Sequence, residues 1–188
     1  ASRDVTVRLE ARLDGDVWDI HGPHYKDMTL GGDASEAFAL AETNEGDHVA
    51  VCARCKLDAE ASCTVAGRQA VHSWTLSLHA GETITLDALA AVYTDRDTDD
   101  PLRAASDAIA TADYDRLRAS HLACWQRLWE TANIEIDGDD AAEEALNYSA
   151  YHLLSIAPRH ARSLSVPARG LSGQTYTGAI FWDTEMFM

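Results

Sequence analysis

An α+β protein is the fold class that this sequence predicts, with an antiparallel β-sandwich followed by helices. Apolar residues alternate with period two through the first half of the chain, and their spacing becomes helical near residue 100. All the predicted strands precede all the predicted helices, an order typical of two structural units and not of a parallel βαβ sheet. The length of 188 residues suits one or at most two domains.

The first strands follow from this alternation and from turn signals. Val5, Val7 and Leu9 share one face of the first strand, and a turn at 14–16 precedes a short strand over 17–20. A loop rich in glycine and aspartate is expected before the next strand. Several short strands at this spacing indicate an antiparallel sandwich.

Two hairpins and a last strand complete the predicted sandwich. The first hairpin has strands at 37–41 and 49–55, joined by the turn Asn44-Glu45-Gly46-Asp47. The second joins 62–65 to 71–78. The last strand spans 83–93 with its apolar side chains facing inward, namely Ile84, Leu86, Ala88, Ala90 and Val92. A charged connector without apolar periodicity follows this strand.

Three helices are predicted after the connector. Asp100 caps the first, Pro101 occupies its first position, and it ends near Thr111. The second begins near Asp113, and the third starts at Asp139 and is ended by Pro158. Apolar residues at helical spacing in the second helix are expected to pack into a core, namely Tyr114, Leu117, Leu122, Trp125, Leu128 and Trp129.

The charge of the chain argues against two classes of partner. Lys and Arg total 15 whereas Asp and Glu total 31, so the formal net charge is −16. Binding to nucleic acid or to anionic lipid needs clustered cations, and no stretch approaches the roughly 18 apolar residues of a membrane-spanning helix. We therefore expect neither nucleic acid nor a membrane as partner. An acidic chain suits a soluble enzyme for a neutral substrate.

Neither end of the sequence resembles a natural terminus. It starts at Ala1 without an initiator methionine or an apolar signal core, and it ends within the apolar run 180–188. The sequence is therefore expected to be a fragment of a longer protein.

The cysteines are predicted to be free thiols in a reducing compartment. Cys52 and Cys55 have the spacing of a zinc knuckle or redox pair, but no second pair of ligands follows them. Residues three apart in a strand point to opposite faces. The loop with His21 and His24 is a weaker candidate for a metal site. We expect no bound metal.

A glycine-rich loop near the end of the chain leads into the segment that carries chemistry. Residues 169–178 contain three glycines but lack the lysine of a phosphate-binding loop. In the segment 181–185 an aromatic pair stands beside two acids, an arrangement suited to sugar binding, because a ring packs on a pyranose while a carboxylate accepts two hydroxyl hydrogen bonds. Alternatively, Asp183 or Thr184 caps a helix there.

This segment resembles the motif that opens the catalytic barrel in family 65 of the glycoside hydrolases. The resemblance rests on Gly170-Leu171-Ser172-Gly173, Tyr176, Gly178 and the run from Phe181 to Met188. It extends to 93–97, to Tyr114-Asp115-Arg116-Leu117 with His121, Trp125 and Leu128-Trp129, and to 147–154. The family contains phosphorylases of maltose, trehalose, kojibiose and nigerose, and some hydrolases.

The resemblance implies a domain layout. Residues 1–94 would be the later part of the N-terminal β-sandwich domain, residues 95–137 a helical linker, and residues 138–188 the start of an (α/α)6 catalytic barrel. The fold that the resemblance implies is therefore a multidomain α+β fragment. It consists of an antiparallel β-sandwich, linker helices and the first part of the (α/α)6 barrel.

The same resemblance implies the site. Trp182 and Asp183 would bind the glucosyl unit whose bond is cleaved, with Phe181, Glu185 and Tyr176 around them. We assign no catalytic residue, because the family's general acid, a glutamate, and its phosphate-binding residues lie downstream of this motif. Gln174, Thr175 and Ala179 stand where the family commonly has Glu, Gly and His, so the acceptor sugar is left open.

The resemblance finally implies an activity. The parent would be an inverting α-glucoside phosphorylase that uses an α-linked glucose disaccharide and inorganic phosphate, needs no cofactor, and releases β-glucose 1-phosphate in the cytoplasm. An inverting α-glucosidase of the same family and a non-catalytic carbohydrate-binding module are the alternatives. A homodimer of the parent is left open.

Overall fold

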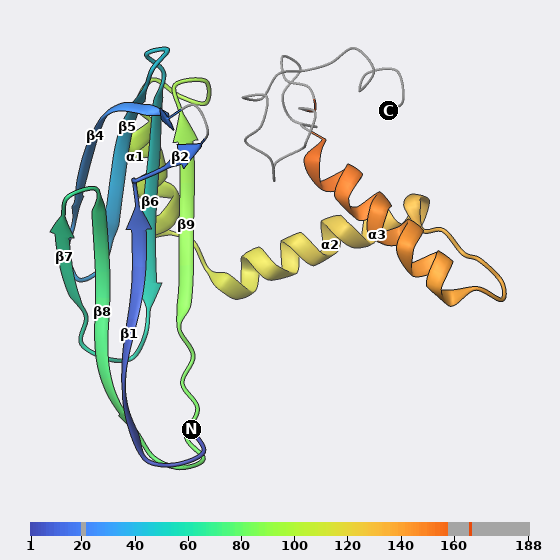
Figure 1. The fold of residues 1–188 in the computed structure, drawn as a ribbon, viewed down its shortest axis with the longest axis horizontal. Helices are drawn as coiled ribbons and strands as arrows, with labels where there is room; N and C mark the ends of the chain where they lie inside the picture. Colours follow the sequence, from blue (N-terminus) through green and yellow to red (C-terminus); the bar gives the residue numbers. More distant parts are fainter. Residues whose placement is uncertain (20–21, 158–165, 167–188) are drawn as a thin grey trace. The chain divides into compact units, whose positions relative to one another are not determined.

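The computed structural model describes residues 1–19, 22–157 and 166, which form nine strands followed by three helices (Figure 1). The strands precede the helices, as the sequence predicts. Their bounds are β1 Val5–Asp14, β2 Trp18–Asp19, β3 Gly22–Pro23, β4 Tyr25–Gly32, β5 Ala37–Thr43, β6 His48–Lys56, β7 Ser62–Ala66, β8 Gln69–Leu78 and β9 Asp87–Thr94. The helices are α1 Pro101–Ala110, α2 Tyr114–Ala132 and α3 Asp140–Ile156.

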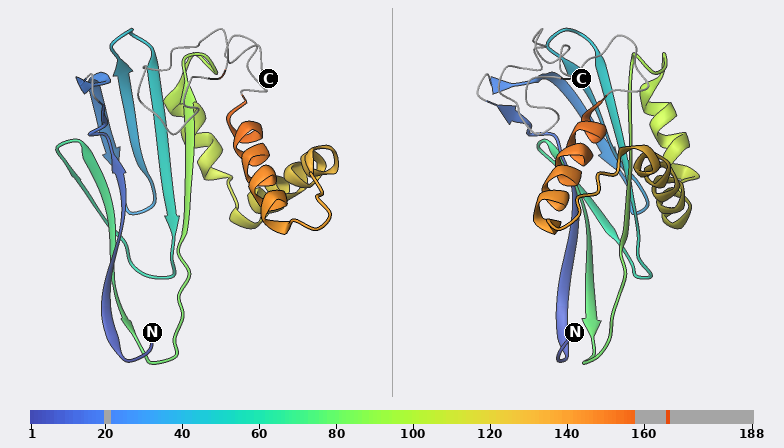
Figure 2. Two further views of the ribbon diagram at one scale, coloured as in Figure 1. Left: turned by 45° about the vertical axis from the view of Figure 1, so that its right-hand side comes forward. Right: turned by 90° about the vertical axis from the view of Figure 1, so that its right-hand side faces the viewer.

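The strands form two facing antiparallel sheets (Figure 2). One has the order β1-β8-β7 and the other β4-β5-β6-β9, while β2 and β3 form a small ribbon. The main contacts between the sheets join β7 and β8 to β4, and β8 and β1 to β5. Both predicted hairpins are present, and Gly46 and Gly67 supply the positive φ angles that their turns require. The antiparallel strand organisation expected from the alternation is thus confirmed.

Strand β4 replaces the loop that the sequence led us to expect. A register shift between Tyr25 and Asp27 breaks the apolar alternation of this strand. Gly31 and Gly32 look like loop residues, yet both pair with β5. A side chain on Gly31 would come within 2.5 Å of the Phe38 ring, so this glycine lets a neighbouring aromatic ring lie against the strand.

Strand β9 is shorter than predicted, and its inward face is open. It begins at Asp87, and residues 83–86 are not part of it. Ala88, Ala90 and Val92 lie on the side of the other sheet, as expected, but all three are exposed. Leu89, Ala91 and Tyr93 lie on the opposite side of β9 and pack against the buried residues beneath α1.

One buried hydrophobic cluster lies between α1 and the sheet that contains β5, β6 and β9. Ala50 and Cys52 of β6 meet Ala105 and Ile109 of α1, and none of these four side chains is more than 1% exposed. The Asp100 carboxylate caps α1 by accepting a hydrogen bond from the Arg103 amide at 3.1 Å, as the sequence predicts. Small residues on β6 therefore let the helix approach the sheet closely.

Arg54 joins β6 to the end of α1. Its guanidinium donates hydrogen bonds to the carbonyl of Ala110 at 3.0 Å and to that of Ala112 at 2.8 Å. These carbonyls lie at the helix C-terminus, where a cation is favoured. The side chain thus anchors the helix to the sheet.

Replacing Arg54 with methionine is expected to lower the free energy of unfolding by about 1–2 kcal/mol, because two charge-assisted hydrogen bonds are lost. Urea unfolding monitored by circular dichroism measures the change. Arg8 is the control, since it pairs with Glu10 on an exposed surface, where such pairs are worth about 0–1 kcal/mol. Equal losses for Arg54→Met and Arg8→Met would contradict this role.

The chain divides into two compact units, Ala1–Leu117 and a second unit that begins at Arg118, so the division falls within α2. Both α2 and α3 begin next to the residues at which the sequence predicts their starts. The carboxylate of Asp113 accepts a hydrogen bond from the Arg116 N–H at 2.9 Å, and that of Asp139 accepts one from the Ala142 N–H at 3.0 Å. The expected core packing of α2 is not found, because none of its residues is buried, and none of α3 is either.

Among the residues that the structure describes, no helix combines the length and the apolar character needed to cross a bilayer.

Candidate functional site

The sugar-binding residues suggested by the sequence lie outside the part of the chain that the structure describes. This applies to Trp182 and Asp183, and equally to Tyr176, Phe181 and Glu185. Their arrangement stays a prediction. The geometry that can be examined is that of the helices preceding the motif and of the sandwich.

The segment between α2 and α3 is held against α3 by two polar side chains. The Asn147 amide accepts a hydrogen bond from the Ile134 N–H at 3.0 Å and donates one to the Ile134 carbonyl at 2.8 Å. The Glu143 carboxylate accepts from the Ile136 N–H at 2.9 Å. These bonds satisfy backbone groups that no helix or sheet pairs. They fix the approach to α3, the helix that precedes the candidate sugar-binding motif in the chain.

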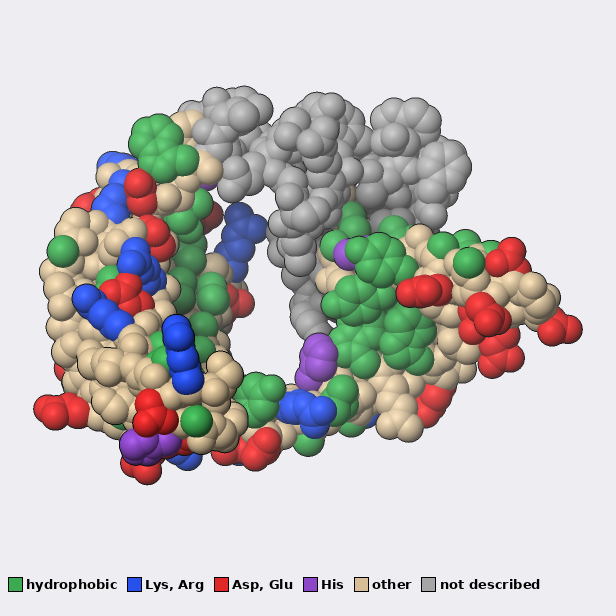
Figure 3. Space-filling model, turned by 60° about the horizontal axis from the view of Figure 1, so that its bottom comes forward, with side chains coloured by type: hydrophobic (Ala, Val, Ile, Leu, Met, Phe, Trp, Pro, Cys, Tyr) green, Lys and Arg blue, Asp and Glu red, His purple; other side chains and the backbone are tan. Residues whose placement is uncertain are grey.

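An aromatic cluster joins α2 to α3. The ring of Trp125 lies 4.8 Å from that of Tyr151 and 6.0 Å from that of Trp129, measured between centroids. His121 and Trp125 are 6.3 Å apart, and Tyr148 stands edge-on to His152 at 4.4 Å. Figure 3 shows hydrophobic side chains gathered on this helical unit. The described contacts of this cluster join only Trp, Tyr and His rings. The cluster therefore packs α2 against α3 and does not pair an aromatic ring with a carboxylate, as the sugar-binding motif is expected to do.

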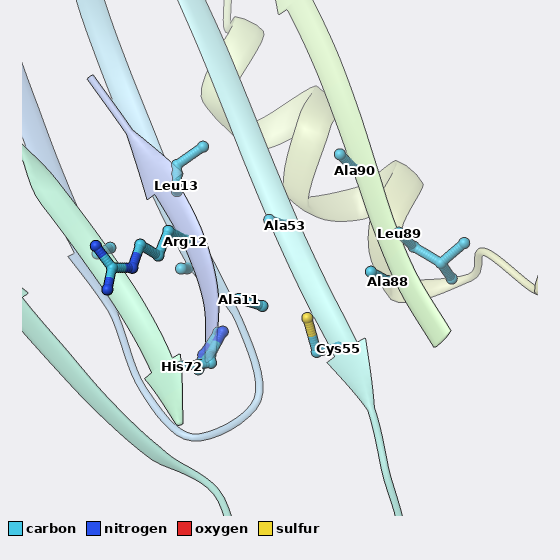
Figure 4. Close-up of a pocket in the computed structure, with 11 residues that line it drawn as sticks. Ala11, Arg12, Leu13, Ala53, Cys55, His72, Ala88, Leu89 and Ala90 are labelled. Carbon is cyan, nitrogen blue, oxygen red and sulfur yellow. The ribbon is translucent and has the colours of Figure 1, made fainter. Parts of the chain in front are cut away.

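A cavity of about 220 Å³ lies within the sandwich unit (Figure 4). Residues of β1, β5, β6, β8 and β9 line it, most of them alanine. The polar side chains on its walls are Arg12, Cys55 and His72. His72 is only 3% exposed, and its Nε2 lies 2.7 Å from the Asp33 carbonyl oxygen, so this imidazole already has a partner. The lining offers apolar surface rather than paired acid–base groups.

The thiols of β6 point to opposite faces of the sheet, as the sequence predicts. Cys52 packs in the core under α1, whereas Cys55 lines the cavity. Burial raises the pKa of Cys52 to about 12 and also raises the pKa of Cys55, which disfavours the thiolate that nucleophilic or ligating chemistry needs. All four cysteines are free. Within the described ranges, no three His, Cys, Asp or Glu side chains gather as metal ligands.

The sequence reasoning did not single out the cavity or the burial of His72. The sequence did contain one indication that His72 is buried. His72 stands two residues before Trp74 on β8, so both side chains lie on the inward face of this strand. The cavity itself has no local signature, since it arises where small residues from five separate strands meet.

Two family models match the chain in succession. Residues 1–128 match the model of the glycosyl hydrolase family 65 N-terminal domain. Residues 147–188, which include the tryptophan–aspartate motif, match that of the glycosyl hydrolase family 65 central catalytic domain.

Curated relatives align with nearly the whole chain. A nigerose phosphorylase of Lachnoclostridium phytofermentans is 36% identical over 100% of the chain, and a 1,2-alpha-glucosylglycerol phosphorylase of Bacillus selenitireducens is 32% identical over 100%. A kojibiose phosphorylase of Escherichia coli is 34% identical over 98%. The chain spans only 29%, 25% and 26% of the lengths of these three relatives, respectively.

A solved structure from the human microbiome, assigned as a kojibiose phosphorylase, shares the fold. It matches 98% of the chain with a TM-score of 0.84 at 17% sequence identity, and the chain covers 26% of that protein. The N-terminal-domain model alone covers more than half of the present chain. The chain therefore belongs to glycosyl hydrolase family 65.

Proposed function

We propose that the full-length protein containing this chain is an inverting α-glucoside phosphorylase that cleaves a disaccharide with inorganic phosphate. The observation that carries this proposal is the similarity, over nearly the whole chain, to relatives named as phosphorylases of nigerose, kojibiose and glucosylglycerol. The match to the central catalytic domain favours an enzyme over the alternative of a free-standing carbohydrate-binding module.

The proposed domain layout assigns residues 1–94 to the sandwich, 95–137 to the linker and 138–188 to the opening of an (α/α)6 barrel. The capped helix α3, whose bounds are Asp140–Ile156, supports a helical start for the last of these. In this layout α1 belongs to the linker by sequence but packs on the sandwich, so it would secure the linker to that domain.

In the proposed reaction an oxygen of phosphate attacks the anomeric carbon of the glucosyl unit as the glycosidic bond breaks. A carboxylic acid elsewhere in the full-length protein gives its proton to the leaving oxygen, which becomes a hydroxyl of the released sugar. Attack on the face opposite the leaving group inverts the α-linkage to β-glucose 1-phosphate. Phosphate is already a nucleophile, so the base carboxylate of an inverting hydrolase is not required.

The proposed role of the motif residues near the end of the chain is to hold the glucosyl unit. Trp182 would pack on the sugar ring while Asp183 accepts hydrogen bonds from two of its hydroxyls. Phe181, Tyr176 and Glu185 would support this pair without taking part in proton transfer. The chain carries a net charge of −16, which agrees with a phosphate pocket formed by other parts of the full-length protein.

Phosphate dependence tests this proposal. Purified full-length protein is incubated with nigerose, kojibiose, maltose and trehalose, with and without inorganic phosphate. We expect consumption of at least one disaccharide only when phosphate is present. Equal turnover without phosphate, with free glucose as the glucosyl product, would instead support an inverting α-glucosidase of the same family.

A cytoplasmic location is proposed on chemical grounds. Phosphorolysis consumes inorganic phosphate and yields a charged sugar phosphate that a membrane retains inside the cell. The four free cysteines of the chain suit a reducing compartment.

A further inference from the structure

An exposed tryptophan with an oriented ring follows the end of β1. Trp18 lies on β2 and is 58% exposed, more than any other tryptophan that the structure describes. Its indole N–H donates a hydrogen bond to the Asp16 carboxylate at 2.7 Å. The Asp16 backbone N–H in turn donates to the Asp14 carboxylate at 2.9 Å. Local hydrogen bonds therefore orient the ring while more than half of the side chain faces solvent.

The loop that carries this tryptophan packs against the β7–β8 turn and against β4. The Gly15 N–H donates to the Arg68 carbonyl at 2.8 Å, and the Gln69 side-chain amide donates to the Asp14 carboxylate at 2.8 Å. A side chain on Gly15 would overlap the Met28 sulfur, so a glycine is needed for this close approach. The loop, the turn and the first half of β4 are thus direct neighbours.

A groove of about 190 Å³ lies between β4 and the β7–β8 turn. The residues that line it are Lys26, Asp27, Met28 and Arg68. The Nε of Arg68 is buried and has no hydrogen-bond partner among the described residues. Because a buried donor without an acceptor is costly, the Arg68 guanidinium has hydrogen-bonding capacity for a ligand in this groove.

The charges around the groove balance one another. Lys26 forms an ion pair with Glu42 at 2.8 Å. The Asp27 carboxylate, which accepts the Met28 N–H at 2.8 Å, offsets the charge of Arg68. A groove without net charge favours neither an anion nor a cation. Its donors and acceptors, together with an exposed indole, suit a neutral sugar, whose hydroxyls form hydrogen bonds while its apolar face packs on a ring.

We propose that Trp18 and this groove form a binding surface for a neutral oligosaccharide on the sandwich unit. One sugar ring packs on the indole, and a neighbouring ring places its hydroxyls against Arg68 and Asp27. Gly15 contacts both Met28 and Arg68, so the tryptophan loop and the groove are close enough for two or three linked sugar units to reach both. The inference goes beyond the proposed phosphorylase function and does not depend on catalysis.

Fluorine NMR of the full-length protein labelled with 5-fluorotryptophan tests this proposal. The Trp18 resonance is identified by its loss in Trp18→Phe, and maltotriose is added without phosphate so that no phosphorolysis takes place. We expect a saturable shift of the Trp18 resonance at millimolar maltotriose. Sorbitol has hydroxyls but no sugar ring, so it should leave this resonance in place.

The contribution of the groove is tested with Arg68→Met. Loss of the guanidinium donors should weaken the maltotriose affinity measured at Trp18 by about fivefold or more. Arg8→Met is the matched control, because Arg8 is an exposed arginine of the same unit that pairs with Glu10, and it should leave the affinity unchanged. Unchanged positions of the other tryptophan resonances show that both variants keep the fold.

Three results would overturn the proposal. The first is a Trp18 resonance that does not move at any maltotriose concentration. The second is an equal shift with sorbitol, and the third is equal maltotriose affinity in Arg68→Met and Arg8→Met. The Trp182 resonance, identified with Trp182→Phe, reports on the proposed glucosyl-binding pair separately. A sugar that fails to move it would count against the proposed function and not against the surface at Trp18.

Discussion

Replacing Asp183 with asparagine in the full-length protein is expected to lower kcat/KM by about a hundredfold or more. The proposed role of this carboxylate is to accept two hydrogen bonds from hydroxyls of the glucosyl unit, and asparagine turns one acceptor oxygen into a donor. Each hydrogen bond to a charged group is worth about 1.5–3 kcal/mol, and a loss of 1.4 kcal/mol corresponds to a tenfold change in kcat/KM. Steady-state kinetics with the preferred disaccharide measures the effect.

The alternative role of Asp183 as a helix cap predicts a different pattern. Asparagine caps a helix as well as aspartate does, so Asp183→Asn would leave both activity and stability nearly unchanged. Asp183→Ala would then lower stability by roughly 1 kcal/mol. Activity of Asp183→Asn within a few-fold of the unmodified protein would therefore rule out the sugar-binding role. Melting temperatures of both variants show whether the fold itself has changed.

Truncating Ile109 to alanine should destabilise the sandwich unit by about 2–5 kcal/mol. Ile109 is only 1% exposed and packs against Ala50 and Cys52 of β6. Those neighbours are small and lie on a sheet that is fixed by its strand pairs, so they cannot collapse to fill the space. The lost contacts and the remaining cavity both contribute to the cost. Urea unfolding of the 188-residue chain, followed by circular dichroism, gives the change in free energy.

Val65→Ala is the matched control for Ile109→Ala. Val65 belongs to the same unit but is 43% exposed on the edge strand β7, so its truncation should cost less than about 1 kcal/mol. Hydrogen exchange of the α1 and β6 amides assigns the loss to the sandwich unit rather than to α2 and α3. Similar losses for the two variants would show that the α1–β6 contact does not form the core.

Local sequence signals predicted most elements of the sandwich correctly. The apolar alternation of β1, the turns at Gly46 and Gly67, and the Asp100 cap of α1 each act over a few residues, so a single sequence contains them. Strand β4 could not be predicted from its own residues, because its glycines resemble those of a loop. Gly31 is needed there because it makes room for the ring of Phe38 on β5. That reason is visible only once the two strands are paired.

Burial was harder to predict than secondary structure. Apolar stripes indicated that Val92 of β9 and Leu122 of α2 would be inside, yet both are exposed in the described chain. An apolar face shows which side of a strand or helix is suited to burial. It does not show whether these 188 residues contain the segment that packs against that face. The sugar-binding motif depended on a family resemblance, because an aromatic pair beside two acids also fits a capped helix start.

The anomeric form of the first glucosyl product tests the central proposal most directly. Full-length protein, phosphate and the preferred disaccharide are combined in an NMR tube, and proton and phosphorus spectra are recorded before mutarotation or side reactions intervene. We predict that β-glucose 1-phosphate appears in step with the loss of the disaccharide. Free glucose as the first glucosyl product in the presence of phosphate, or α-glucose 1-phosphate, would contradict inverting phosphorolysis.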